Sequence, residues 1–510
     1  MRRVFASGNV STLRIVPSLF LLIALAIASA SPALAQQFIG QIDLDDGDPG
    51  NIPDSPFGAT VTPDGRFVLV CVSGDPDFDP PNPPDLNNRE VRVIDRATDT
   101  VVNVITVGLF PVACDITVDG TDNYLWVCNS SDGNVSVFQV ENGDFDDPGS
   151  ITEAVFSPVS TGAFSFPGGI AADAANERVW VGTGGGTGEV FSIDADPQSG
   201  TFGAIVDTAL LQGGSSTGRL AIYDEYLVVP HAVFAFPLSD GRATIIDTGN
   251  TNDKVEIFLT PTLDFNQGEF VSTIDVAVTD DGFAYLTLLG PGTGQNVIVL
   301  DVPNRMFDRA IFLAGADTED QHGIGISPDS GLAAVTNFGS QKIVFLDLDD
   351  DSIVSVLDSP NDEPNEVVWA LDSCTAYVTN QNTNGGTSNS IGIIGRFDDR
   401  ELSLTGTSSP AIGGEIELFI QGGCEGRKGG ILESEALGSG TFRGIAVPLA
   451  NPVRVAEGGR YDVRGEITAQ PIQVPIDPSL IGTSMHYVAG AQDQGGAIRL
   501  SNVHTVIFQP

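Results

Sequence analysis

The chain has 510 residues, 41% of them hydrophobic, and a formal net charge of −44 at neutral pH. The hydrophobic content indicates a packed globular protein, and the length indicates at least two domains. So acidic a chain repels polyanions, which excludes nucleic acid and anionic lipid as partners and favours solubility, divalent cations or basic partners.

Residues 1–35 have the pattern of a signal peptide. The basic stretch MRRVFASGNVSTLR is followed by the apolar run LFLLIALAIA, and Pro32-Ala33-Leu34-Ala35 ends in the small-x-small pattern of a cleavage site. The run is shorter than the ~18 apolar residues of a membrane span. We expect an exported protein, periplasmic or extracellular, with no transmembrane segment in the mature chain. An uncleaved anchor is the alternative.

Three phrases recur in fixed order after the leader. A Pro is followed eight residues later by Asp, as in Pro56 to Asp64 and Pro111 to Asp119; a β-rich strand comes next; and an apolar strand often ends in Asp, as at Asp95 and Asp347. A period of about fifty residues with four short strands per unit is typical of a β-propeller. The tight-turn sequences PDG, VDG and DDG fit hairpins between the strands.

Seven copies of the first three strands are present, but the seventh lacks an outer strand. Residues 38–44 resemble the outer strands of the other copies and directly precede the first copy. The sequence therefore predicts an all-β fold in which a seven-bladed β-propeller, residues 36–398, is closed by an N-terminal strand that pairs into the last blade.

Two features of the first two repeats suggest bound metal or a covalent link. Asp75, Asp77 and Asp79 alternate in the longest insertion, and alternating Asp residues often supply oxygen ligands to calcium. Cys114 and Cys128 flank the turn VDGTDN; if Val118 pairs with Tyr124, these two cysteines lie opposite each other. A cross-strand disulfide and two buried thiols are the alternatives there.

The seventh copy contains Tyr377-Val378-Thr379-Asn380, and looser versions occur at residues 334–337 and 126–129. With this repeat the chain resembles the YVTN-type seven-bladed propellers of bacterial exported proteins and archaeal surface layers. The resemblance implies the fold but no chemistry, because the recurring residues form turns and blade contacts.

From about residue 399 the repeat ends. Short alternating strands punctuated by Gly and Pro continue to residue 510, which predicts a compact β-sandwich or small barrel over 399–510. This segment resembles uncharacterised C-terminal β-modules of exported bacterial proteins, and that resemblance implies no activity.

Propeller ligands usually bind at the mouth of the axial channel, where the innermost strands begin. The unusual polar residues at those strand starts are Arg219, Asp275, Gln321, His322, Asn365 and Glu366. No nucleotide-binding or hydrolase motif occurs in a convincing context. The leading hypothesis is a non-catalytic exported propeller that binds a protein, a surface polymer or a metal. The alternative is a lactonase-like hydrolase at the channel mouth, with His322, Glu366 and Arg219 as catalytic groups.

Overall fold

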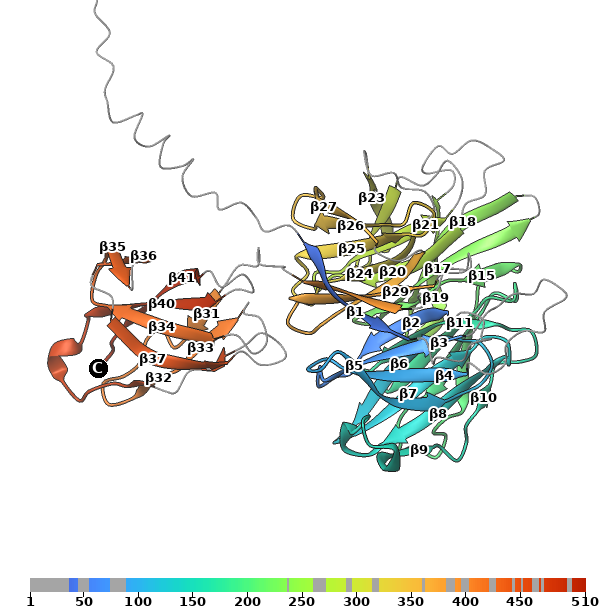
Figure 1. Cartoon of the computed structure of the whole chain (residues 1–510), viewed down its shortest axis with the longest axis horizontal. Coiled ribbons are helices and arrows are strands. Elements are labelled where there is room, and N and C mark those ends of the chain that lie inside the picture. Colours follow the sequence, from blue (N-terminus) through green and yellow to red (C-terminus); the bar gives the residue numbers. More distant parts are fainter. Residues whose placement is uncertain are drawn as a thin grey trace, which may run out of the picture.

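A computed structural model covers the whole chain, and strands dominate it (Figure 1). The residues described below are 36–44, 55–73, 89–235, 238–259, 272–289, 296–313, 321–359, 363–381, 390–395, 403–421, 428–442, 445–450, 453–460, 467–468, 472–492 and 498–510. The predicted leader, residues 1–35, and the predicted calcium ligands Asp75, Asp77 and Asp79 lie outside these ranges. In the part of the chain described, no helix is long and apolar enough to span a membrane.

Antiparallel sheets of four main strands follow one another along the repeat region. The first sheet consists of β2 (Pro56–Val61), β3 (Phe67–Val72), β4 (Glu90–Asp95) and β5 (Thr100–Thr106), and the second of β6 (Pro111–Asp119), β7 (Asp122–Asn129), β8 (Asn134–Val140) and β10 (Val159–Ser160), with β9 (Ile151–Glu153) also paired with β8. The third sheet consists of β11 (Pro167–Asp173), β12 (Arg178–Thr183), β13 (Glu189–Asp194) and β14 (Ile205–Leu210). The fourth consists of β15 (Ser215–Thr217), β17 (Tyr226–Ala235), β18 (Leu238–Asp247) and β19 (Asn250–Phe258), with β16 (Ala221–Tyr223) also paired with β17.

Three further sheets continue the series. The fifth sheet consists of β20 (Ser272–Val278), β21 (Phe283–Leu289), β22 (Asn296–Asp301) and β23 (Met306–Phe312). The sixth consists of β24 (Gln321–Ile326), β25 (Leu332–Asn337), β26 (Lys342–Asp347) and β27 (Ile353–Asp358). The seventh consists of β28 (Pro364–Trp369), β29 (Thr375–Asn380), β30 (Ser390–Gly395) and β1 (Gln37–Asp43). The short 3-10 helices η1 (Glu141–Gly143) and η2 (Pro148–Ser150) lie between β8 and β9.

The N-terminal strand β1 pairs antiparallel with β30, so Ile42 lies opposite Ile391 and Asp43 opposite Ser390. Ile42 is 5% exposed and packs in one cluster with Val70 of β3 and Tyr377 of β29. Strand β1 is thus the outermost strand of the seventh sheet and shares a core with the first.

The inner strands of successive sheets contact one another in sequence order, and the last contacts the first. In the sixth sheet, Thr336 Oγ1 donates to the carbonyl of Asn365 in the seventh at 2.7 Å. In the seventh, Thr379 Oγ1 donates to the carbonyl of Phe57 in the first at 2.9 Å. Apolar side chains fill the space between neighbouring sheets; for example, Leu69 of the first sheet packs with Leu125 of the second.

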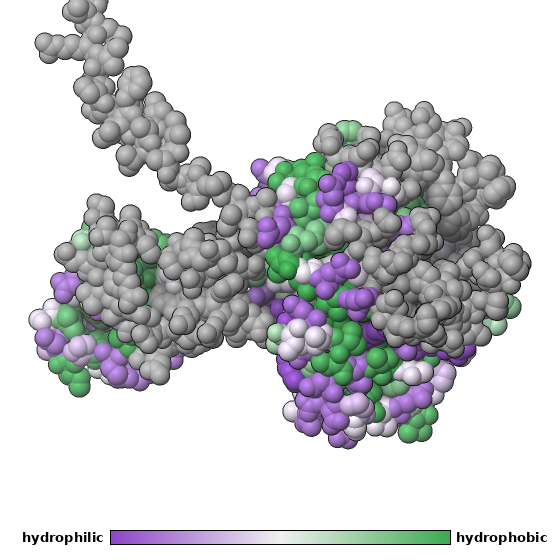
Figure 2. Space-filling model, viewed as in Figure 1, coloured by the Kyte–Doolittle hydropathy of each residue, from purple (hydrophilic) through white to green (hydrophobic). Residues whose placement is uncertain are grey.

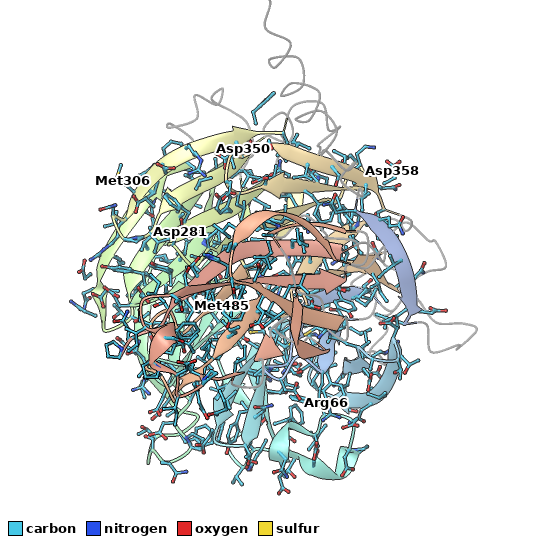
Figure 3. All side chains as sticks on the ribbon, turned by 90° about the vertical axis from the view of Figure 1, so that its left-hand side faces the viewer. Arg66, Asp281, Met306, Asp350, Asp358 and Met485 are labelled. Atoms are coloured by element: carbon cyan, nitrogen blue, oxygen red, sulfur yellow. The ribbon has the colours of Figure 1, made fainter. Side chains whose placement is uncertain are left out.

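Outside the core, the outer strands alternate between half-buried and exposed residues, as in β5 and β27. Met306, Asp350 and Asp358 are exposed and lie at the periphery of the molecule (Figure 3). Apolar and polar residues are interspersed on the face displayed in Figure 2. At this rim arginines join neighbouring sheets. Arg309 of β23, for example, donates two hydrogen bonds to Asp351 of the next sheet, from Nε to Oδ2 at 2.5 Å and from Nη2 to Oδ1 at 2.9 Å.

The C-terminal strands form a separate group with a core of its own (Figure 1). A four-stranded sheet has the order β37-β34-β40-β41 and a three-stranded sheet the order β31-β33-β38, with the pairs β32-β39 and β35-β36 beside them. Ile420 of the three-stranded sheet and Ile431 and Tyr487 of the four-stranded sheet share one buried cluster. The elements are β31 (Ser403–Gly406), β32 (Glu415–Ile416), β33 (Leu418–Gln421), β34 (Lys428–Ser434), β35 (Leu437–Phe442), β36 (Ile445–Leu449), β37 (Val453–Arg460), β38 (Ile467–Thr468), β39 (Ile472–Gln473), η3 (Pro478–Leu480), β40 (Ser484–Gln492) and β41 (Ile498–Ile507).

Of the two alternatives for Cys114 and Cys128, the structure has the buried thiols and not the cross-strand disulfide. The hairpin between β6 and β7 turns on two residues, Gly120 at φ +63° and Thr121, with Asp119 opposite Asp122. Tyr124 therefore lies opposite Thr117 rather than Val118, and Cys128 lies opposite Ala113. A shift of one residue turns a side chain to the other face of the sheet. Cys374, by contrast, is disulfide-bonded.

Candidate functional site at the inner strands

An ion pair joins two sheets that are not neighbours in the sequence. Arg219 follows β15 in the fourth sheet, and its Nη2 binds Oε2 of Glu366, in β28 of the seventh sheet. The two side chains are only 18% and 15% exposed. The guanidinium also lies against the first sheet: a Cβ added to Gly58 would be 2.8 and 2.9 Å from its two terminal nitrogens. Arg219 thus contacts the inner strands of the first and seventh sheets from the fourth.

Glu366 is held by more than the arginine. The backbone N–H of Ala59, in the first sheet, also donates to its carboxylate. Burial raises the pKa of Glu366 above the ordinary value of 4.5, and the charge of Asp275 raises it further, whereas Arg219 and these hydrogen bonds oppose the increase. The folded site therefore holds a proton on Glu366 more tightly than solvent would.

Asp275, in β20 of the fifth sheet, makes the same kind of link between sheets. Its Oδ1 accepts from the N–H of Val276 at 2.7 Å, and its Oδ2 accepts from the N–H of Ile324 in the sixth sheet at 2.9 Å. Burial raises the pKa of Asp275 to about 6, against the lowering effect of Arg219 and of these two N–H groups. Both carboxylates near Arg219 thus bind the backbone of the following sheet.

His322 and Asn365 form a second contact, between the sixth and seventh sheets. His322 Nδ1 and Asn365 Oδ1 are 2.7 Å apart. The Asn365 amide is oriented by its Nδ2, which donates to the carbonyl of Phe57 at 3.2 Å, so its Oδ1 acts as an acceptor and His322 Nδ1 carries the hydrogen. The imidazole also stacks on Phe338, with ring centroids 4.8 Å apart. An amide, rather than a carboxylate, therefore orients this histidine through Nδ1.

Gln321, the remaining residue of the predicted mouth, is fully buried at the first position of β24. Neither its Nε2 nor its Oε1 has a hydrogen-bond partner among the residues that the structure describes. The predicted set is thus split: Arg219 meets Glu366, His322 meets Asn365, Asp275 binds main chain, and the Gln321 amide has no polar partner within the described ranges.

Asp115 belongs with these inner-strand acids, although the sequence analysis did not single it out. It lies in β6, and its carboxylate accepts from the N–H of Ile116 and, across the sheet boundary, from the N–H of Ala172, both at 2.8 Å. Burial raises its pKa against the effect of those hydrogen bonds. The available signal was an acidic residue inside the otherwise apolar phrase PVACDIT.

No group of three or more His, Cys, Asp or Glu side chains suited to a metal ion occurs within the described ranges. The predicted calcium ligands are not among those residues, so calcium binding at Asp75, Asp77 and Asp79 stays a prediction.

Comparison with known proteins supports the fold alone. No protein-family model matches the chain, and no curated protein matches it. Among solved structures 912 chains match, too many for the likeness to single out a function. One is Kuenenia stuttgartiensis Hydrazine Synthase, with a TM-score of 0.52 and 17% identity over 69% of this chain and 98% of that chain. Such a distant likeness carries the β-propeller-like all-β architecture and no activity.

Proposed function

We propose that this chain is an exported seven-bladed β-propeller of the YVTN type, closed by strand β1, with a small β-sandwich-like module after it. Three observations support the proposal: four-stranded sheets in series, contact between the first and last inner strands, and the pairing of β1 with β30. Closure in this way removes a sheet edge and ties the two ends of the ring together. Export rests on the predicted leader.

The function we propose is non-catalytic binding of a partner, with the propeller as a rigid scaffold and a protein or surface polymer as the ligand. The observation that carries it is that polar side chains of the predicted channel mouth already bind other groups of the protein. Glu366 binds Arg219, and both oxygens of Asp275 accept backbone N–H groups. A general base has to reach the proton it abstracts, whereas these groups already stabilise the contacts between sheets.

Two assays on the purified protein test this proposal. Incubation with a panel of lactones and nitrophenyl esters should give no turnover above that of the His322→Ala and Glu366→Gln variants. Co-sedimentation with insoluble polysaccharides, and calorimetric titration with candidate protein partners, should reveal a bound ligand. Turnover that disappears in folded His322→Ala would overturn the proposal in favour of the lactonase-like hydrolase.

A further inference from the structure

Two phenylalanine rings are exposed at the end of the third sheet where its inner strand begins. Phe164 and Phe166, in the segment between β10 and β11, are 81% and 40% exposed, and their ring centroids are 6.5 Å apart. Leu210, the last residue of β14 in the same sheet, is 59% exposed. Large apolar side chains that are exposed together on a globular protein mark a surface of interaction.

A glycine hairpin between β12 and β13 joins the two exposed segments. On one side, the N–H of Gly184 donates to the carbonyl of Phe166 at 2.7 Å. On the other side, the N–H of Leu211 donates to the carbonyl of Gly188 at 2.7 Å. The hairpin reads GGGTG, so it adds almost no side chains of its own. Residues 161–167, 184–188 and 210–214 therefore form one surface, which we call the aromatic surface.

The backbone holds both rings in place. Phe164 and Phe166 have φ values of +62° and +48°, a region that side chains rarely adopt. A Cβ at Gly185 would be 2.1 Å from the carbonyl oxygen of Phe164, so the hairpin packs directly against this backbone. Ser165, between the two rings, is buried, and its Oγ is 2.7 Å from Oγ1 of Thr161. Because the segment is held in this way, a binding event has little backbone freedom to remove.

The aromatic surface carries no charge, although the chain is strongly acidic. Charged residues make up 18% of the chain, yet residues 154–172, 179–188 and 208–218 contain none. A basic partner attracted by the net charge of −44 would bind where carboxylates lie, and an ion would need a counter-charge. The centre of a protein interface, by contrast, is depleted of charge and enriched in aromatic side chains. The matching partner is therefore a neutral, apolar protein surface.

The charged residues that flank the aromatic surface fit a second copy of it. Towards the second sheet, Asp132 is exposed, and the next residue, Gly133, accepts at its carbonyl from the N–H of Thr161 at 3.0 Å. Towards the fourth sheet, Nζ of Lys254 donates to the carbonyl of Leu210. In a two-fold interface residue i contacts j and j contacts i. A two-fold axis at the glycine hairpin brings Asp132 of each copy to Lys254 of the other, and the rings of each copy to the other's hairpin.

We propose that the aromatic surface binds a second copy of this chain in a symmetric dimer, with Phe164 near its centre. Two chains of net charge −44 repel each other, and they can approach most closely where neither carries charge. An interface with two rings from each copy is small, so the association is weak and reversible. The dimer goes beyond the proposed function and does not depend on a ligand at the channel mouth.

Sedimentation velocity of the purified protein at about 10–300 μM tests the dimer. The chain should shift from monomer to dimer over this range in about 0.5 M NaCl and less in about 0.02 M NaCl, because salt screens the repulsion between the copies. Phe164→Asn should weaken the Kd at least tenfold, because symmetry removes the ring twice. The matched control Phe312→Asn removes a ring that is 57% exposed in the fifth sheet, and it should leave the Kd within about twofold.

Folding and pairing can be judged with the same variants. Asn tolerates a φ near that of Phe164 and the lost ring is exposed, so the melting temperature of Phe164→Asn should equal or exceed that of the unaltered protein. Lys254→Glu should weaken the dimer about threefold, since it sets two carboxylates against each other at both edges. Adding Asp132→Lys to Lys254→Glu should restore the Kd, because each edge then pairs opposite charges again.

Several results would overturn the dimer. These are a chain that stays monomeric at about 300 μM in both salts, a dimer that Phe164→Asn leaves intact, and a dimer that dissociates as salt rises. A folded charge-swap variant that fails to regain affinity would reject the two-fold arrangement. If the chain stays monomeric and Phe164→Asn abolishes co-sedimentation with an insoluble polysaccharide, the aromatic surface binds a polymer instead. Lactone turnover would reject the proposed function and leave the dimer standing.

Discussion

Replacing Arg219 with Met should destabilise the repeat region in a way that depends on pH. The change keeps much of the side-chain volume and removes the charge that pairs with Glu366. Breaking a buried ion pair costs about 3–5 kcal/mol, and because both partners keep some exposure we expect about 3 kcal/mol where Glu366 is ionised. For a region of this size that corresponds to a fall of about 4 °C in melting temperature.

The sign of the pH dependence follows from the raised pKa of Glu366. A carboxyl whose folded pKa exceeds its unfolded value lowers the free energy of unfolding as pH rises from the unfolded pKa, 4.5, through the folded one. Without Arg219 the folded pKa rises further, so this loss continues to higher pH. Scanning calorimetry should therefore find the smallest deficit of Arg219→Met at about pH 5 and the largest at about pH 9.

Two variants control this experiment. Arg219→Met combined with Glu366→Gln leaves no ionisable group in the pair, so its deficit should change less between about pH 5 and pH 9 than that of Arg219→Met alone; the change that remains comes from Asp275, whose pKa Arg219 also lowers. Arg305→Met removes a rim arginine whose partner, Asp253, is 48% exposed, and its cost should be below about 1 kcal/mol. A deficit of Arg219→Met that is the same at both pH values would refute the buried-pair reasoning.

Three smaller predictions test other parts of the structure by calorimetry or peptide mapping. Gly58→Ala should lower the melting temperature by several degrees, since its Cβ would clash with the backbone carbonyl of Val112 and press on the guanidinium of Arg219; an unchanged transition would contradict that packing. Cys114 and Cys128 should be alkylated only after unfolding, because both are buried; a hydrogen bond with Cys71 and burial raise the pKa of Cys114, and burial raises that of Cys128. Labelling of the native chain would show that the thiols are accessible. Ile42→Asp should lower the melting temperature and expose β1 to proteases, because it places a carboxylate at a core position where the native side chain is 5% exposed; a protease-resistant variant would show that β1 is dispensable.

The sequence was sufficient to predict the sheets because each repeat carries its own local signals. The inner and second strands meet at tight turns such as that of Gly65, and the second strands are mostly apolar and buried, as the complete burial of Phe67–Val72 shows. The register in which neighbouring strands pair was harder to predict from the sequence. The turn at Gly120 and Thr121 has two residues, whereas the cysteine prediction assumed three, and this single difference places Cys114 opposite Val127.

The sequence predicted which residues belong to the candidate site but not which of them pair with one another. The alternative hydrolase hypothesis has Arg219, His322 and Glu366 acting together, whereas the structure pairs Arg219 with Glu366 and His322 with Asn365. Which inner strands face each other depends on how the sheets are arranged in space, and no local pattern encodes that. The link from Asp115 to the backbone of Ala172 was missed for the same reason, since its partner is 57 residues away.

In a repeat protein, departures from the repeat mark the residues that need an explanation of their own. Asp275 and Glu366 occupy the inner-strand position that is glycine in Gly58 and Gly323, and both accept a backbone N–H from the following sheet. These polar groups are satisfied within the protein, which gives them a role in holding sheets together. Gln321 is also a departure, but its amide has no hydrogen-bond partner among the residues that the structure describes. A polar departure from the repeat is therefore tested first for a role between sheets, and only an accessible group without such a role is a candidate for binding an outside ligand.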